Sequence, residues 1–159
     1  MSKFILFVDS DDTISPDTFE ILNREVDGFD ITVFGLNRLF ENKNGEIYKT
    51  EKLFHPEFIT ASLNDSGQLL ISLNRAGIFP FVWNKAYKRT LLLETGALFE
   101  NAKITEDCYF NLFLFQKTDK IKVISDCLYN YRKPALQTLT NSYSPEFLNL
   151  SKRKFLLEK

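Results

Sequence analysis

The 159-residue sequence lacks the marks of several protein classes. Its 20 Lys and Arg residues nearly balance its 21 Asp and Glu residues, so no excess of positive charge indicates a nucleic-acid-binding protein. No apolar run approaches the ~20 residues that a membrane-spanning helix needs. Two cysteines without a CxxC pair and a single histidine argue against a zinc site built from these residues.

What remains is the composition of one folded domain. Hydrophobic residues make up 44% of the chain and charged residues 26%, as is typical of globular domains. The 16 phenylalanines indicate an aromatic-rich core or a surface that binds flat rings. The apolar run 4–8 is too short for a signal peptide, so we expect a cytoplasmic protein. The basic and apolar segment 147–159 either covers the core, which we favour, or contacts the inner face of a membrane.

The order of apolar patterns predicts an α/β fold. The continuous apolar run 4–8 predicts a central strand covered on both faces. It is followed by an acidic loop and by a helix with Ser15 as its N-cap and Pro16 in its first turn. The segment 30–53, with Asn44-Gly45 at its turn, predicts a hairpin. The remaining predicted elements are helices at 56–76 (broken at 66–67), 89–94, 105–117 and about 145–159, and strands at 120–124 and 127–132.

The acidic loop is the first candidate site. Asp9, Asp11 and Asp12 follow the first predicted strand directly, and open α/β sheets bind ligands at the carboxyl ends of their strands. Carboxylates packed so closely repel one another, and a divalent cation such as Mg or Mn makes the cluster favourable. The alternative is an acidic turn that only caps the next helix.

Two enzyme families share this arrangement. The segment 9–14 (DSDDTI) resembles the signature of haloacid dehalogenase phosphatases, which implies Asp9 as the nucleophile and Asp11 as the general acid. That family also needs a lysine and a second acidic pair near a later strand. After the predicted strand at 120–124 only Asp126 appears, so this resemblance is incomplete.

The other resemblance extends along nearly the whole chain. The segment 7–12 (FVDSDD) is similar to the metal-binding DxD region of family 2 glycosyltransferases. Three further segments resemble that family in the same order: 82–89 (VWNKAYKR), 105–107 (TED) and 128–132 (LYNYR). The resemblance implies a partial GT-A fold, a mixed sheet with flanking helices. It also implies that residues 1–159 form a single incomplete domain without the N-terminal nucleotide-binding segment.

The resemblance implies roles for individual residues. Asp11 would bind the metal that bridges the donor diphosphate, and Asp9 would lie near the ribose or the donor sugar. Asp107 would be the base of an inverting transfer, with Glu106 in contact with donor or acceptor. A place in the first turn of a helix should keep Asp107 ionised.

Three more residues are weaker candidates. Lys85 and Arg132 are candidates for contacts to phosphate or acceptor, because a diphosphate needs cations beyond one metal; both could also be ordinary surface residues. Trp83 is the only tryptophan. It either stacks on a ring of the substrate or belongs to the core.

These residues predict a metal-dependent glycosyltransferase of the kind used in cell-surface polysaccharide biosynthesis. Its substrates would be a nucleotide-sugar donor and a sugar, lipid-linked or polymer acceptor. Since exposed apolar strand edges invite pairing, we expect self-association or a partner chain that supplies the missing strands, and weak or no activity from this chain alone. The alternatives are the phosphatase and a non-catalytic, self-associating fragment.

Overall fold

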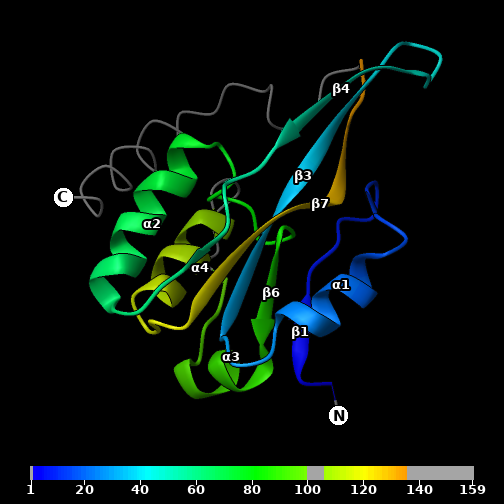
Figure 1. The fold of residues 1–159 in the computed structure, drawn as a ribbon. Coiled ribbons are helices and arrows are strands. Elements are labelled where there is room, and N and C mark those ends of the chain that lie inside the picture. The colour runs from blue at the N-terminus through cyan, green and yellow to red at the C-terminus, as the bar shows by residue number, and fades with distance from the viewer. Residues whose placement is uncertain (1, 100–105, 136–159) are drawn as a thin grey trace.

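A computed structural model describes residues 2–99 and 106–135 of the chain (Figure 1). The strands of this part are β1 (Phe4–Leu6), β2 (Thr13–Ile14), β3 (Ile31–Glu41), β4 (Ile47–Leu53), β5 (Phe58–Ile59), β6 (Lys85–Lys88) and β7 (Ile121–Lys133). Its helices are α1 (Thr18–Glu25), α2 (Leu63–Arg75), α3 (Arg89–Thr95) and α4 (Glu106–Phe115). The strands form one mixed sheet, which confirms the predicted α/β class.

The sheet has the order β1-β6-β3-β7-β2, with β4 beside β3 and β5 beside β7. Its centre is the parallel pair β3 and β7, and every other pair is antiparallel. The first half of β3 bonds to β6 and its second half to β4. Apolar residues at the start of the parallel pair, such as Val33 and Val123, are fully buried. The core is therefore centred on these two strands.

Helices cover both faces of the sheet. Adjacent residues of a strand point to opposite faces, and β6 shows which helix lies on each. Tyr87 donates a hydrogen bond from its hydroxyl to Asn111 of α4, whereas Ala86 lines a groove with Leu22 of α1 and with Val26, which directly follows that helix. α4 in turn packs against α2. The sheet therefore lies between α1 and the α4–α2 layer, as Figure 1 shows.

A glycine allows β3 and β7 to stay paired where their register shifts. The register shifts on both sides of Gly35. A Cβ atom at this position would lie 2.8 Å from Cβ of Phe54 and 2.9 Å from Sγ of Cys127. A side chain there would have to push apart β3, β7 and the chain after β4, so only glycine fits.

Several predicted elements are confirmed. The hairpin of β3 and β4 turns at the predicted residues, and Gly45 has a positive φ of 80°. The short helix α3 ends at Gly96, whose φ of 63° lies in the left-handed region. The helix predicted at about 145–159 lies outside the described residues.

Four predictions are corrected by tertiary contacts. β1 lies at the end of the sheet and bonds only to β6 among the described strands, so it is not central here. α1 begins at Thr18, three residues beyond the predicted N-cap. The strands predicted at 120–124 and 127–132 are one strand, β7.

The fourth correction concerns the segment 56–76. It begins with β5, and α2 starts only at Leu63, capped by the Ser62 hydroxyl. α2 continues past Ser66, whose buried hydroxyl lies 3.1 Å from the carbonyl oxygen of Thr118 and 3.3 Å from that of Ser62 and shares its one proton between them.

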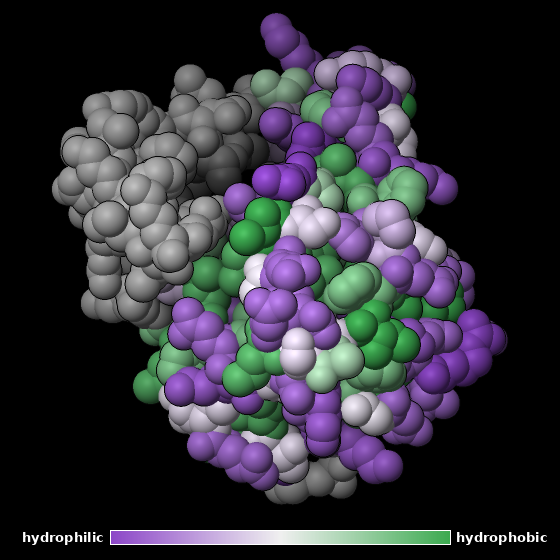
Figure 2. Space-filling model, turned by 60° about the vertical axis from the view of Figure 1, so that its left-hand side comes forward, coloured by the Kyte–Doolittle hydropathy of each residue, from purple (hydrophilic) through white to green (hydrophobic). Residues whose placement is uncertain are grey.

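The surface does not present a large apolar face in the view of Figure 2, where apolar and polar residues are interspersed. None of the helices in the described ranges is long and apolar enough to cross a membrane.

Candidate functional site

The acidic loop after β1 brings three carboxylates together. Oxygen atoms of Asp9, Asp11 and Asp12 all lie within 4.8 Å of one another. The loop is a tight turn, closed by a hydrogen bond of 3.2 Å from the Asp12 N–H to the Asp9 carbonyl. Asp9 and Asp11 are exposed. The cluster therefore presents anionic oxygen atoms to solvent.

The strand β7 holds this loop in place. The Tyr129 hydroxyl accepts a hydrogen bond of 3.1 Å from the Asp9 N–H and donates one of 2.8 Å to Asp12 Oδ2. The backbone N–H of Arg132 donates to Asp12 Oδ1 at 2.7 Å. Both oxygens of Asp12 are thus engaged within the protein. Asp12 supports the loop and leaves Asp9 and Asp11 as the carboxylates that are open to solvent.

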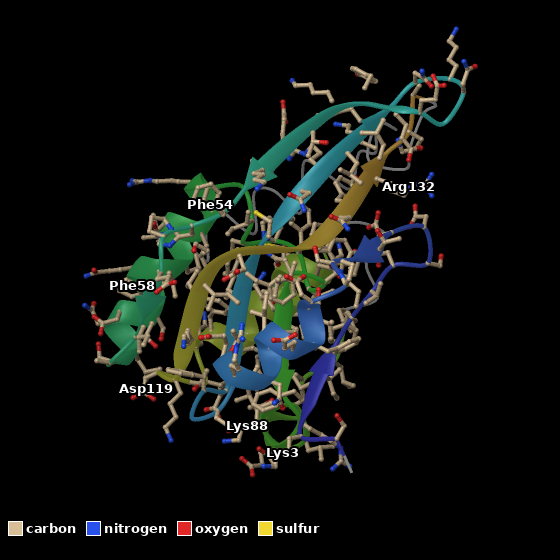
Figure 3. The ribbon with its side chains drawn as sticks, turned by 45° about the vertical axis from the view of Figure 1, so that its right-hand side comes forward. Lys3, Phe54, Phe58, Lys88, Asp119 and Arg132 are labelled. Atoms are coloured by element: carbon tan, nitrogen blue, oxygen red, sulfur yellow. The ribbon has the colours of Figure 1, made fainter. Side chains whose placement is uncertain are left out.

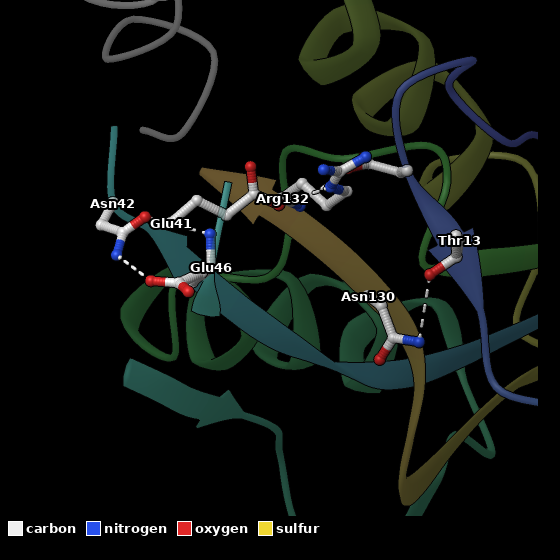
Figure 4. Close-up of polar contacts among 7 residues, drawn as sticks. Thr13, Glu41, Asn42, Glu46, Asn130 and Arg132 are labelled. Carbon is white, nitrogen blue, oxygen red and sulfur yellow. Dashed lines mark hydrogen bonds and ion pairs between the residues drawn. The ribbon is translucent and has the colours of Figure 1, made fainter. Parts of the chain in front are cut away.

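A second connection lies one residue further along. β2 pairs with β7, and the Asn130 side chain donates a hydrogen bond of 3.3 Å to the Thr13 hydroxyl (Figure 4). Because β2 begins directly after Asp12, this pairing fixes the end of the acidic loop.

The electrostatics of the loop favour a cation. Burial, followed by the charges of Asp11 and Glu106, raises the pKa of Asp9. Burial also raises the pKa of Asp12, although the hydrogen bonds from Arg132 and Tyr129 oppose the shift. A bound cation would relieve the repulsion that contributes to both shifts.

Asp107 lies in the first turn of α4, as the sequence predicts. Its Oδ2 accepts a hydrogen bond of 3.3 Å from the Val82 N–H. Burial, followed by the charges of Glu106 and Asp9, raises the pKa of Asp107 to about 6. We expected the helix terminus to keep this group ionised; burial instead moves the pKa upward, to a value at which the carboxylate still predominates at pH 7.

Glu106 is next to Asp107, and the structure brings it to the acidic loop. Its charge acts on both Asp9 and Asp107. Phe7, just before the loop, also packs edge-on against Phe110 of α4, with ring centroids 6.1 Å apart. The start of α4 therefore lies close to the loop after β1, although about 100 residues separate them along the chain. The fold assembles four of the predicted site residues here: Asp9, Asp11, Glu106 and Asp107.

Arg132 also belongs to this region. Figure 3 shows it beside β2, far from Lys3 and Lys88. Its Nε donates a hydrogen bond of 2.6 Å to Glu41 (Figure 4), and its side chain is 48% exposed. That bond, and after it the charges of Glu41, Asp11 and Asp12, raises the guanidinium pKa. The positively charged guanidinium of Arg132 thus lies at the edge of the acidic loop, bound to Glu41 but open to solvent.

Lys85 requires a correction, because it does not present its charge to a ligand. The residue is fully buried, and its Nζ donates to the carbonyls of Phe79 at 2.9 Å and Phe81 at 2.5 Å. Burial lowers the pKa of its ammonium to about 7. A group with no exposed surface cannot contact a donor phosphate, so we remove Lys85 from the candidate ligand contacts.

Trp83 is also placed in the core. It is 4% exposed and is stacked with Phe81, Tyr129 and Tyr131, at ring-centroid distances of 4.3, 4.1 and 5.5 Å. Because aromatic rings of the protein stack with the indole of Trp83, the core alternative is correct and stacking on a substrate ring is not.

Tyr129, Val82 and Asn111 were not assigned roles from the sequence. Tyr129 lies within the LYNYR segment, so the resemblance marked its neighbourhood without marking its hydroxyl. Val82 contributes only a backbone N–H, for which no sequence signal exists. Asn111 lies four residues after Asp107 on α4, a spacing that places both side chains on the same face of the helix. This spacing was the signal in the sequence that could have identified Asn111.

The phosphatase alternative is not favoured. The acidic cluster found within the described residues comprises Asp9, Asp11 and Asp12 and does not include Asp126. Thr13, which is part of the segment that resembles the dehalogenase signature, lies in β2, paired with β7. The second acidic pair of that family therefore has no counterpart in the described part of the chain.

Comparisons with known proteins agree with the glycosyltransferase resemblance. No model of a known protein family matches the chain. The chain is 25% identical over 143 residues to the uncharacterized glycosyltransferase EpsJ of Bacillus subtilis (strain 168), covering 89% of this chain and 41% of that protein.

Solved structures show the same fold. Residues 1–349 of S. aureus TarS in complex with UDP-GlcNAc match with a TM-score of 0.67 and 24% identity, over 99% of this chain and 43% of that one. The complex of TarS with UDP matches with a TM-score of 0.62, over 98% of this chain and 40% of that one. The chain spans less than half the length of these proteins. It therefore has part of the GT-A fold of glycosyltransferases, as the sequence resemblance implied.

Proposed function

We propose that this chain forms the metal- and acceptor-side part of a glycosyltransferase site, which transfers a sugar from a nucleotide diphosphate to an acceptor hydroxyl. The observation that carries the proposal is the meeting of two acidic segments: the loop with Asp9 and Asp11, and the start of α4 with Glu106 and Asp107. The complexes of TarS with UDP and UDP-GlcNAc support a UDP-sugar as the donor.

The residues of the acidic loop fit a divalent cation. Hard cations such as Mg and Mn prefer carboxylate oxygen atoms, and Asp9 and Asp11 present theirs to solvent. Asp11, with Asp9 beside it, would hold the ion. A bound ion would supply charge neutralisation at the departing diphosphate.

The chain's own residues have distinct parts in this reaction. Asp107 accepts the proton of the attacking hydroxyl, and its pKa of about 6 leaves it ionised at neutral pH yet basic enough to take a proton. Attack by that hydroxyl from the face opposite the diphosphate inverts the anomeric centre. Glu106 orients donor or acceptor, and Arg132 offers its exposed guanidinium to phosphate or acceptor.

We infer an acceptor class and a cellular location for this reaction. The acceptor is a sugar, a lipid-linked saccharide or a polymer, and the reaction takes place in the cytoplasm.

A strand edge supports the expectation of association. Among the described strands β1 bonds only to β6. Beside it lies a groove of about 500 Å³ whose lining includes Phe4, Leu6, Leu22 and Val26. An added strand from a second copy or another polypeptide would satisfy the backbone groups of β1 and cover this apolar lining. A clean monomer by light scattering at micromolar concentration would contradict this.

Calorimetric titration tests the donor site. UDP should bind the chain in the presence of Mn, and binding should disappear without Mn and in Asp11→Ala. Asp126→Ala, which removes an exposed carboxylate outside the cluster, is the matched control and should bind like the native chain. Binding of UDP that is independent of both Mn and Asp11 would contradict the proposed site. No binding under any condition would favour a non-catalytic fragment.

A further inference from the structure

A second polar cluster lies in the core, next to the candidate site. It consists of four side chains with no exposed surface: Asn84, Lys85, Tyr87 and Asn111. Buried polar groups are costly unless they are hydrogen-bonded. The partners of these side chains therefore show what the cluster stabilises.

Lys85 of β6 holds one side of the loop formed by residues 78–82. Its Nζ donates to the carbonyls of Phe79 at 2.9 Å and Phe81 at 2.5 Å, with a longer contact of 3.4 Å to that of Ile78. The Asn84 side chain accepts from the same Nζ at 2.8 Å. The ammonium group thus binds backbone carbonyls of a segment that lies outside the strands and helices and whose first N–H groups, those of Ile78 and Phe79, donate to the Leu73 carbonyl at the end of α2.

Asn111 of α4 binds the same loop. Its Nδ2 lies 3.3, 2.9 and 3.1 Å from the carbonyl oxygens of Phe79, Pro80 and Phe81, and its two protons are shared among these three acceptors. Its Oδ1 accepts a hydrogen bond of 2.6 Å from the Tyr87 hydroxyl, which fixes the orientation of the amide. The 78–82 loop is therefore held between β6 and α4.

The loop held in this way contacts both halves of the candidate site. Its last residue, Val82, donates its N–H to Asp107. The next residue, Trp83, stacks on Tyr129 at 4.1 Å and 16°, and the Tyr129 hydroxyl binds both ends of the acidic loop. Asp107 and Asn111 are four residues apart on α4 and so bind the loop from the same helix face.

We propose that Lys85 and Asn111 are positioning residues, which hold the 78–82 loop so that Asp107 and the acidic loop keep one fixed relative geometry. The catalytic meaning of this geometry rests on the proposed function, but the positioning itself can be measured without ligand or turnover. The competing role is that the cluster only fills the core.

Two variants of the full 159-residue chain test the proposal. Asn111→Leu and Lys85→Met keep similar volumes and remove the donors. The control is Thr118→Val, which removes a buried hydroxyl that donates to Asp30 at 2.7 Å, beyond the other end of α4. All three variants are compared below their melting temperatures, where circular dichroism shows them folded.

The measurements report on three groups in and beside the site: the Val82 amide, the Asp107 carboxyl and the Trp83 indole. In the two cluster variants we expect hydrogen exchange of the Val82 amide to accelerate at least about tenfold. The Asp107 carboxyl carbon resonance should shift, and Trp83, the only tryptophan, should change its fluorescence. The control should leave all three unchanged. If the native chain turns over a donor, Asn111→Leu should lower kcat and leave KM for the donor within about twofold.

Two results would overturn positioning. One is a folded Asn111→Leu with native Val82 and Asp107 signals; the other is an equal change of these signals in Thr118→Val. If both cluster variants fail to fold, hydrogen exchange in the native chain tests the proposal instead. A Val82 amide that exchanges as fast as an open loop would contradict the positioning role, and one that exchanges as slowly as core amides would support it. If the chain passes these tests but does not bind UDP in the presence of Mn, the positioning role is supported and the proposed function is contradicted.

Discussion

Two polar clusters lie side by side in this molecule and are stabilised in opposite ways. Around Lys85 every buried donor is met by backbone carbonyls or by another side chain. In the acidic loop, Asp9 and Asp11 stay exposed and repel their neighbours, which contributes to the raised pKa of Asp9. The first cluster is complete within the protein, whereas the repulsion in the second would be relieved by a bound cation. Polar residues alone therefore do not identify a site, because the buried cluster is explained by the contacts that it makes within the protein.

The largest effect should come from breaking the complete cluster. Lys85→Met leaves backbone carbonyls in the core without a donor, and we expect a loss of about 3 kcal/mol in the free energy of unfolding, measured by urea denaturation. Lys88→Met on the same strand removes only a part-exposed ion pair with Asp30 and should cost less than about 1 kcal/mol. Equal losses in the two variants would contradict the contrast between the clusters.

A smaller effect should follow from removing the hydroxyl that links the core to the acidic loop. Tyr129→Phe keeps the ring stacked on Trp83 but removes the bonds to the Asp9 N–H and to Asp12. We expect a loss of about 1–2 kcal/mol and shifted amide resonances at both ends of the loop. Tyr48→Phe, at an exposed position, is the control and should change neither quantity.

A pH-dependent effect should separate Asp107 from the exposed carboxylates. Because its pKa in the folded protein is raised to about 6 from 3.8, folding favours its protonated form, and the associated stability is lost as pH rises through 6. Asp107→Asn keeps an acceptor for the Val82 N–H and cannot ionise. Its stability relative to the native chain should therefore increase between about pH 4 and pH 7. A difference that does not vary with pH would show that Asp107 is not desolvated.

The smallest effect on stability should occur in the incomplete cluster. Asp11→Asn removes one of the mutually repelling charges from an exposed loop, so the free energy of unfolding should stay within about 0.5 kcal/mol of the native value or rise slightly. The same variant should lose any increase in melting temperature that Mn produces in the native chain. A marked loss of stability without Mn would mean that Asp11 supports the fold, as Asp12 does.

Local patterns predicted much of the fold because their causes are local. Asn44-Gly45 suits a hairpin turn wherever it occurs, and Gly96 ends α3 because it can adopt a positive φ. The helix boundary at Leu63 was missed because β5 depends on pairing with β7, more than 60 residues away. The same limit applied to the site: the acidic segments were visible in the sequence, but the hydroxyl of Tyr129 and the N–H of Val82 gained their roles only through contacts across the fold.

The sequence by itself determined the class of the fold, the order of the four motif segments, and the acidic residues that meet at the site. Only the tertiary structure decided that Lys85 and Trp83 belong to the core and that Arg132 remains open to solvent. The reason is that residue type and spacing set what a side chain can do, whereas burial depends on which distant segments pack against it. A lysine that could bind phosphate at the surface instead bonds to backbone carbonyls because β6 and α4 enclose it.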